Sequence, residues 1–302
     1  MNEYLKDPSI VLKALGSRQL LNWMPDEMYI RLLYRFHERK RLNLDNPTLL
    51  NEKLQWLKLY DHNPKYTMMV DKYKVKEDVR EVIGEEYIIP TLGVWNNAKK
   101  IEFDKLPNQF VLKTNHDSHS LVICKNKADF DYKSAIKKLN KSLKRNGFWY
   151  GREWPYKNVE PLVLAEEFIQ NRDGSSLVDY KFYCYGGKPI YFMCSYGEAE
   201  HNAKNHKFDM NLKSIDHLFK KKPAIDEKDV TIPDNIDQMV SIVEKLCKGY
   251  QHIRIDLYNV DGHIYFGEMT FYSSAGLINI YSKDYSDYLA SLIDIHAIEK
   301  TV

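Results

Sequence analysis

Cysteines are few in this sequence, and long apolar runs are missing. The chain has four cysteines, far apart and without the paired spacing of a metal site or a disulfide framework: Cys124, Cys184, Cys194 and Cys247. Three of them stand in apolar segments with the pattern of strands, so we expect reduced cysteines packed in the core. No stretch reaches the roughly 18 consecutive apolar residues of a membrane helix, and the first residues lack the pattern of a secretion signal. These absences predict a cytoplasmic protein.

An excess of charge of one sign is missing as well. Lys and Arg total 44 and Asp and Glu total 42, which gives the 302 residues a net charge of +2. This balance argues against a general nucleic-acid binder. Neither a P-loop (GxxxxGKS or GxxxxGKT) nor the GxGxxG pattern occurs, which argues against an oxidoreductase that uses a dinucleotide.

Helical patterns dominate the first part of the chain, and strand patterns the rest. Apolar spacing and prolines predict four helices, over 9–21, 26–39, 48–60 and 66–82. The remainder alternates mainly like antiparallel strands, and we expect two hairpins and two further helices, over 109–125, 179–196, 132–145 and 235–248. The predicted fold class is therefore α+β.

A predicted hairpin over residues 252–271 carries three charges among apolar residues. A two-residue turn at 261–262 would place Glu268 on the apolar face, whereas a three-residue loop at 260–262 pairs Arg254 with Glu268. We therefore predict the three-residue loop. One face then holds the charges and their neighbours, namely Arg254, Asp256, Tyr258, Phe266, Glu268 and Thr270.

Charged groups on one sheet face need partners, because an unpaired buried charge is costly. Arg254, Asp256 and Glu268 either satisfy one another or form a site for magnesium and phosphate, in which the carboxylates are hard oxygen ligands. Lys113 likewise allows two interpretations. It ends the apolar strand FVLK before the polar loop TNHDSHS, and it is either an edge-strand lysine or a clamp for a polyphosphate.

Taken in order, these motifs resemble the ATP-grasp superfamily, in particular the D-alanine–D-alanine ligases. The chain has VDK at 70–72, VLK at 111–113, LAEEFI at 164–169, RID at 254–256 and EMT at 268–270. A closer resemblance is to the TupA-like ATP-grasp family, proteins of bacterial surface-polysaccharide loci. It extends over almost the whole chain, through segments such as NEKLQWLKLYDHNP, LPNQFVLKTNHDS and GREWPYKNVEP.

The resemblance implies an ATP site. Lys72 and Lys113 would contact the phosphates, and Glu166 would accept a hydrogen bond from the adenine amino group. The carbonyl of Glu167 and the amide of Ile169 would bind the adenine edge. Two further ATP contacts are implied on the following strand: an acidic ribose contact at Asp179, and Lys181.

The resemblance also implies a magnesium site and its catalytic partners. Asp256, Glu268 and Thr270 would hold the metal, while Arg254 and Lys113 would stabilise the transferring phosphoryl group. The ATP-grasp superfamily usually has Asn where this chain has Thr270, and a hydroxyl is a poorer oxygen donor. A second departure is at His119 and Ser120, where a Gly-rich phosphate loop is common.

The fold implied by the resemblance is an ATP-grasp fold with an N-terminal helical extension. We expect this extension, the N-terminal part of the core, a lid and a C-terminal catalytic subdomain over residues 1–60, 61–96, 97–159 and 160–302. The implied activity is that of an ATP- and magnesium-dependent carboxylate–amine ligase that works through an acyl phosphate. Its role would be to amidate a uronic acid, or to attach an amino acid to a sugar, during capsule or O-antigen assembly.

Two interpretations of the aromatic stretch WYGREWPYKN stay open. Arg152, Trp154 and Tyr156 suit recognition of a sugar acid, but the same residues suit a packed surface loop. Other functions also remain: a glycosyltransferase, although no DxD motif stands at a plausible strand end, an ATP-grasp kinase, or an ATP-binding scaffold without activity.

The basic cluster 39–41 ends one predicted helix, where it either complements the helix dipole or contacts a membrane surface. We expect a protein of the bacterial cytoplasm. Its N-terminal helices are candidates for peripheral contact with the inner membrane face or with a glycosyltransferase.

Overall fold

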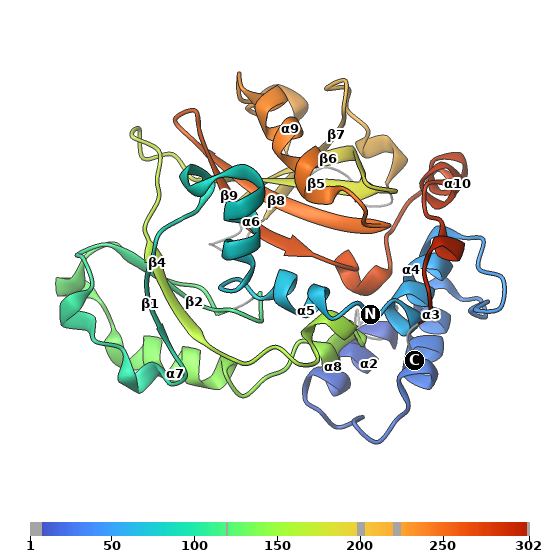
Figure 1. The fold of residues 1–302 in the computed structure, drawn as a ribbon, viewed down its shortest axis with the longest axis horizontal. Coiled ribbons are helices and arrows are strands. Elements are labelled where there is room, and N and C mark those ends of the chain that lie inside the picture. Colours follow the sequence, from blue (N-terminus) through green and yellow to red (C-terminus); the bar gives the residue numbers. More distant parts are fainter. Residues whose placement is uncertain (1–7, 119, 198–202, 220–224, 301–302) are drawn as a thin grey trace.

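The structure of the chain, a computed structural model, describes residues 8–118, 120–197, 203–219 and 225–300. Two antiparallel sheets stand apart in the fold, and the N-terminal helices lie at one end, next to the C-terminal helix (Figure 1). This arrangement confirms the predicted α+β class.

The larger sheet has five strands in the order β7-β6-β5-β8-β9. Their bounds are Lys204–Asp209, Lys188–Tyr196, Val178–Tyr185, His252–Val260 and His263–Thr270. Helix α9 (Ile236–Cys247) packs on β6 and β8. Its apolar side is buried with those strands in the main core, where Phe182, Phe192 and Ile255 are fully buried. The predicted hairpin over 179–196 and the predicted helix over 235–248 are therefore present, whereas β7 was not predicted.

The smaller sheet has four strands in the order β1-β4-β2-β3. Their bounds are Thr91–Trp95, Val163–Glu167, Phe110–Thr114 and Val122–Cys124. Helix α7 (Tyr132–Ser142) packs on this sheet, which has an apolar core of its own around Phe110, Leu112 and Leu139. The subdomain boundaries expected from the sequence stay a prediction.

The N-terminal helices pack on one another and lie at one end of the larger sheet (Figure 1). They are α2 (Pro8–Ser17), α3 (Asp26–Glu38) and α4 (Leu50–Tyr60), and α10 (Lys283–Ser291) lies against α4. None of the helices in the described ranges has the length and apolarity needed to cross a bilayer. Leu20 and Trp23 are 58% and 73% exposed between α2 and α3, and the proposed contact of these helices with a membrane or partner stays a prediction.

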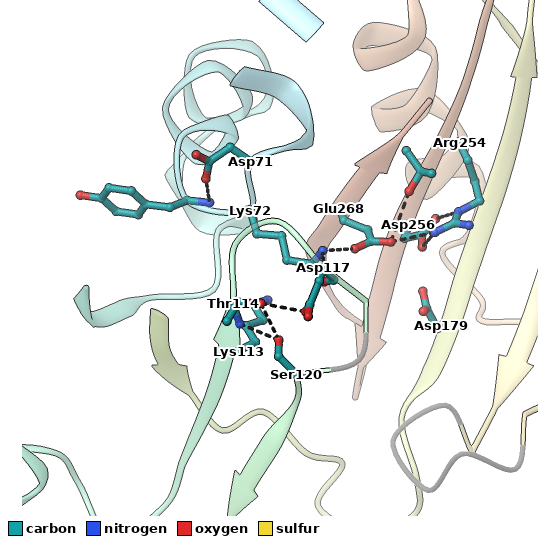
Figure 2. A network of polar contacts seen from close by, with 12 residues as sticks. Asp71, Lys72, Lys113, Thr114, Asp117, Ser120, Asp179, Arg254, Asp256 and Glu268 are labelled. Atoms are coloured by element: carbon teal, nitrogen blue, oxygen red, sulfur yellow. Dashed lines mark hydrogen bonds and ion pairs between the residues drawn. The ribbon is translucent and has the colours of Figure 1, made fainter. Parts of the chain in front are cut away.

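The single helix predicted over 66–82 is wrong. Two helices form instead, α5 (Lys65–Val70) and α6 (Val75–Ile83), separated by a turn at Asp71. The Asp71 carboxylate accepts hydrogen bonds from the backbone N–H groups of Tyr73 and Lys74, and such local bonds compete with helix continuation. The break points Lys72 into the space between the two sheets (Figure 2).

The register predicted for the β8-β9 hairpin is also wrong, although its charged face is right. Val260 pairs with His263 around a two-residue turn, in which Asp261 and Gly262 have φ of 50° and 88°, as a type I′ turn requires. A β-bulge between Asp256 and Leu257 then shifts the pairing by one residue. The bulge brings Glu268 opposite Asp256 and Thr270 opposite Arg254, while Phe266 pairs with Leu257 and lies in the core.

Glycine at position 267 makes this bulge possible. A Cβ added there would lie 3.0 Å from the Asp256 carbonyl oxygen, so a larger residue would push the two strands apart. The bulge thus replaces the three-residue loop as the device that keeps Glu268 out of the apolar face.

All four cysteines are buried and free, which confirms the prediction of reduced core residues.

His252 makes the fold sensitive to acid. It is 2% exposed, and burial lowers its pKa from 6.5 to about 4. Because the folded-state pKa lies below the unfolded value, the stabilisation is complete above about pH 6.5 and is lost as the pH falls through about 4, a loss of about 3 kcal/mol. We expect His252→Gln to remove this part of the acid sensitivity. Urea unfolding at pH 7.5 and pH 4.5 measures the effect, and an equal loss in wild type and variant would contradict it. The exposed His217→Gln is the control.

Candidate functional site

Charged side chains from both sheets meet around Lys72. Its Nζ lies 2.8 Å from Glu268 Oε2 on the larger sheet and donates to the Asp117 carbonyl oxygen of the smaller sheet's loop at 3.0 Å. Figure 2 shows Lys72 between the two, with Lys113 and Thr114 on one side and Asp256 and Glu268 on the other. The turn at Asp71 therefore links the two sheets through one lysine.

Arg254 joins the two carboxylates of the hairpin. Its guanidinium donates to both oxygens of Asp256, at 2.6 Å and 2.7 Å, and to Glu268 Oε1 at 2.8 Å. Burial opposes ionisation of both Arg254 and Glu268, but the opposite charges prevail. The two carboxylates raise the pKa of Arg254, and Lys72 and Arg254 lower that of Glu268. Both groups are therefore charged at neutral pH.

Lys181 and Asp179 on β5 extend the cluster. Lys181 Nζ lies 3.1 Å from Asp256 Oδ2 and also contacts Asp179. Burial alone would lower the pKa of Lys181, but Asp179 and Asp256 raise it. Burial raises the pKa of Asp179 to about 7, and its Oδ1 is buried without a hydrogen-bond partner in the described part of the chain. This oxygen can therefore accept a further hydrogen bond.

The cluster is balanced by its own residues. Three cations face three carboxyl groups, namely Lys72, Lys181 and Arg254 against Asp179, Asp256 and Glu268. A bound polyphosphate would compete for the cations and leave the carboxylates in need of a positive partner. A divalent cation is such a partner, so the arrangement suits the joint binding of a polyphosphate and a metal.

The donor set fits magnesium. Asp256 and Glu268 stand opposite each other on neighbouring strands, and the Thr270 hydroxyl lies 3.3 Å from Glu268 Oε1. No group of three or more Asp, Glu, His or Cys that could hold a metal is found among the described residues. Magnesium typically uses one or two carboxylates with substrate phosphates and water, so two carboxylates are enough.

Lys113 and Glu166 form a second centre on the smaller sheet. Glu166 is 3% exposed, and its two oxygens lie 2.6 Å from Lys76 Nζ and 2.5 Å from Lys113 Nζ. Burial opposes ionisation of Glu166, but the two lysines lower its pKa. Lys76 was missed from the sequence, although it lies four residues after Lys72, a spacing that places two side chains on one face of the helix predicted over 66–82.

The groups expected to bind the adenine edge lie at the end of β4. The backbone N–H of Glu167 donates to the Pro90 carbonyl. The carbonyl group of Glu167 lies at the last residue of β4. No hydrogen bond from the Ile169 amide occurs within the described ranges. These two positions stay predictions for adenine binding.

Side-chain hydrogen bonds, one of them from Ser142 of α7, hold the segment after Lys113. The Asp117 carboxylate accepts hydrogen bonds from Thr114 Oγ1 at 2.8 Å and from Ser142. Ser120 Oγ accepts from the Thr114 backbone N–H at 2.7 Å. His119 lies outside the described residues. Asp117 was missed from the sequence, because its partner Ser142 is 25 positions away.

Arg152 does not point into the site. It is 1% exposed, and its guanidinium donates to the Leu21 carbonyl at 2.8 Å and stacks on Tyr29 and Trp149. This placement agrees with the packed-loop interpretation, because Arg152 anchors the aromatic stretch to the α2-α3 connection. Its expected contact with a substrate carboxylate stays a prediction.

Trp154 and Tyr156 have different surroundings from Arg152. The Trp154 ring stacks on His62, 4.7 Å between centroids. Burial, followed by the charges of Glu153 and Glu268, raises the pKa of Tyr156, so its hydroxyl group lies within electrostatic range of the cluster.

Residues 52–294 match the sequence profile of a family described as TupA-like ATP-grasp. No curated protein matches the chain.

Among solved structures, the D-alanine–D-alanine ligase from Bacillus anthracis is similar at 16% identity and a TM-score of 0.40, over 68% of this chain and 57% of that one. The same ligase from Helicobacter pylori has 15% identity and a TM-score of 0.41, over 89% and 69%. Phosphoribosylamine–glycine ligase from Thermotoga maritima has 14% and 0.38, over 71% and 51%. The chain thus spans little more than half the length of the Bacillus anthracis ligase.

Proposed function

The chain belongs to the TupA-like ATP-grasp family, and from this premise we propose that it is an ATP- and magnesium-dependent carboxylate–amine ligase. The observation that carries the proposal is the balanced cluster of three cations and three carboxyl groups between the two sheets. It offers a binding place for a polyphosphate and a divalent cation together.

ATP binding exchanges the partners of these charges. Three cations exchange their carboxylate partners for phosphate oxygens, namely Lys72, Lys181 and Arg254. Lys113 of the smaller sheet likewise exchanges Glu166 for a phosphate oxygen. Asp256 and Glu268, with the Thr270 hydroxyl, would hold magnesium. Transfer of a lysine to phosphate also frees a Glu166 oxygen for the adenine amino group, which agrees with the role predicted for Glu166. Asp179 remains the predicted ribose contact.

The chemistry needs no nucleophilic side chain. The terminal phosphoryl group of ATP passes to the substrate carboxylate, and an amine then displaces phosphate from the acyl phosphate. Arg254 and Lys113 stabilise the charge that develops on the phosphoryl oxygens. Magnesium, when bound, neutralises phosphate charge and aligns the phosphates. The space between the sheets keeps water from the acyl phosphate if the smaller sheet closes as a lid.

The carboxylate substrate is proposed to be a uronic acid, and the amine to be ammonia or an amino acid, in cell-surface polysaccharide assembly in the bacterial cytoplasm. The support is the family's association with such loci together with the placement of Tyr156 beside the cluster. A sugar hydroxyl is a suitable partner for this phenol group.

An ADP-release screen tests the proposal. Purified protein with ATP and magnesium is supplied with uronic acids and amines, alone and in pairs, and in a parallel reaction with a sugar nucleotide. We expect ADP release to require a carboxylate, and hydroxylamine to trap the acyl phosphate as a hydroxamate. Consumption of a sugar nucleotide without ADP release would contradict the ligase and favour a glycosyltransferase.

A further inference from the structure

A second pair of ionisable groups lies beside the charge cluster and has no part in the roles proposed above. Lys58 is on α4, and Glu153 directly precedes the short helical turn Trp154–Tyr156. Lys58 is 1% exposed. Its Nζ donates to the carbonyl oxygens of Gly151 at 2.7 Å and Ala275 at 2.8 Å. Lys58 therefore ties the aromatic stretch to the segment that follows β9.

That segment, residues 272–276, has an unusual backbone. Tyr272, Ser274 and Ala275 have φ of 56°, 58° and 61°, a region that residues other than glycine rarely adopt and that persists only where the surroundings hold it. Gln55 of α4 helps by donating to the Gly276 carbonyl at 2.7 Å. The intervening Ser273 contacts Arg254 at 3.4 Å, so this segment borders the charge cluster.

Glu153 lies at the same junction. A Cβ added to Gly151 would lie 2.6 Å from the Ala275 Cβ and 3.0 Å from Glu153 Oε1, so these groups are close neighbours. Tyr156 connects them with the cluster, because Glu153 and Glu268 both act on its hydroxyl group. Glu153 is half-buried, and its carboxylate has no hydrogen bond or ion pair to any described residue.

Charges on several elements act on Glu153. Burial raises its pKa to about 7, and Lys58 of α4, Lys13 of α2 and Arg254 of β8 work in the opposite direction. Burial also lowers the pKa of Lys58 to about 7. The other titratable groups that face Glu153 are the phenols of Tyr156 and Tyr272. A carboxylate in such surroundings is a stronger base at neutral pH than an ordinary one.

We propose that Glu153 holds the ammonium group of the acceptor and takes a proton from it as the amine attacks the acyl phosphate. The inference rests on the ligase function proposed above. An acceptor amine arrives protonated. It must lose a proton before its nitrogen lone pair can attack. As the C–N bond forms and the C–O bond to phosphate breaks, nitrogen loses two protons. One passes to Glu153, and the other leaves with the phosphate as HPO4²⁻.

Replacing the amine with hydroxylamine distinguishes the role of Glu153 in amide formation from a role in the reaction with ATP. It is largely uncharged at neutral pH and needs no base. The assay supplies ATP, magnesium and D-glucuronate or D-galacturonate, with hydroxylamine or with ammonia, glycine or serine. We expect Glu153→Gln to form hydroxamate within about twofold of wild type and amide at least about 100-fold more slowly. Glu153→Asp should restore part of the amide rate, and Glu153→Gln should lose the limb near pH 7 in the kcat/KM profile.

Each other outcome overturns the inference in a distinguishable way. Without hydroxamate from the wild type, the ligase function fails, and this inference fails with it. With hydroxamate formed, equal amide rates in wild type and Glu153→Gln would exclude Glu153 alone, and hydroxamate without any amide would exclude an ammonium acceptor. An equal loss of both products in Glu153→Gln would assign the residue to folding or to the ATP reaction. The exposed Glu160→Gln is the matched control.

Discussion

Asp256→Asn should abolish ligase turnover and also lower the melting temperature by about 10 °C. The Asp256 side chain is 2% exposed and holds both Arg254 and Lys181. Removing its charge leaves these buried cations with one counter-charge fewer, and breaking a buried pair in this way costs about 3 to 5 kcal/mol. The same change removes a proposed magnesium ligand, so activity and stability fall together.

Differential scanning calorimetry and the ADP-release assay measure the two effects. Asp261→Asn is the matched control: it is the same substitution in the turn of the same hairpin, where φ of 50° suits asparagine. A fully stable Asp256→Asn would contradict the ion-pair account of the protein without ligand. Retained turnover would contradict the metal role.

Arg254→Lys should lower turnover by on the order of 10² to 10³ with a smaller loss of stability than Asp256→Asn. The substitution keeps the charge but removes the fork, which contacts both Asp256 oxygens, Glu268 and Ser273 at once. A lysine ammonium cannot reproduce these directions.

Steady-state kinetics test the Arg254 prediction, and the 92% exposed side chain of Arg172 offers Arg172→Lys as the control. The proposed phosphoryl contact of Arg254 requires kcat to fall. If Arg254→Lys keeps kcat within about threefold of wild type, charge alone is sufficient and the geometric argument is wrong.

The sequence predicted which charged residues share a face of the hairpin, but it did not predict the backbone pairing that positions them. Alternation along β8 and β9 placed Arg254, Asp256 and Glu268 on one face, because burial of a lone carboxylate is costly. The bulge at Gly267 was missed, since a glycine in a strand is compatible with several pairings. Local patterns therefore predict which face a charge takes more readily than the register that places it there.

Contacts between distant segments could not be predicted from local patterns. Arg152 binds the carbonyl of Leu21, 131 positions earlier in the chain, and no spacing rule links the two. Lys58 and Ala275 are likewise 217 positions apart. The break at Asp71 was missed for a different reason: the apolar spacing continues through it, and the side chain of one aspartate decides the outcome.

A thermal-shift experiment tests the central claim, which is that ATP and magnesium bind together at this cluster. At about 100 times the dissociation constant, a ligand stabilises a protein by about 2.7 kcal/mol. We predict that ATP with magnesium raises the melting temperature of the wild type, that Asp256→Asn loses the magnesium-dependent part, and that UDP-glucose has no effect. A shift with UDP-glucose and none with ATP and magnesium would contradict the account.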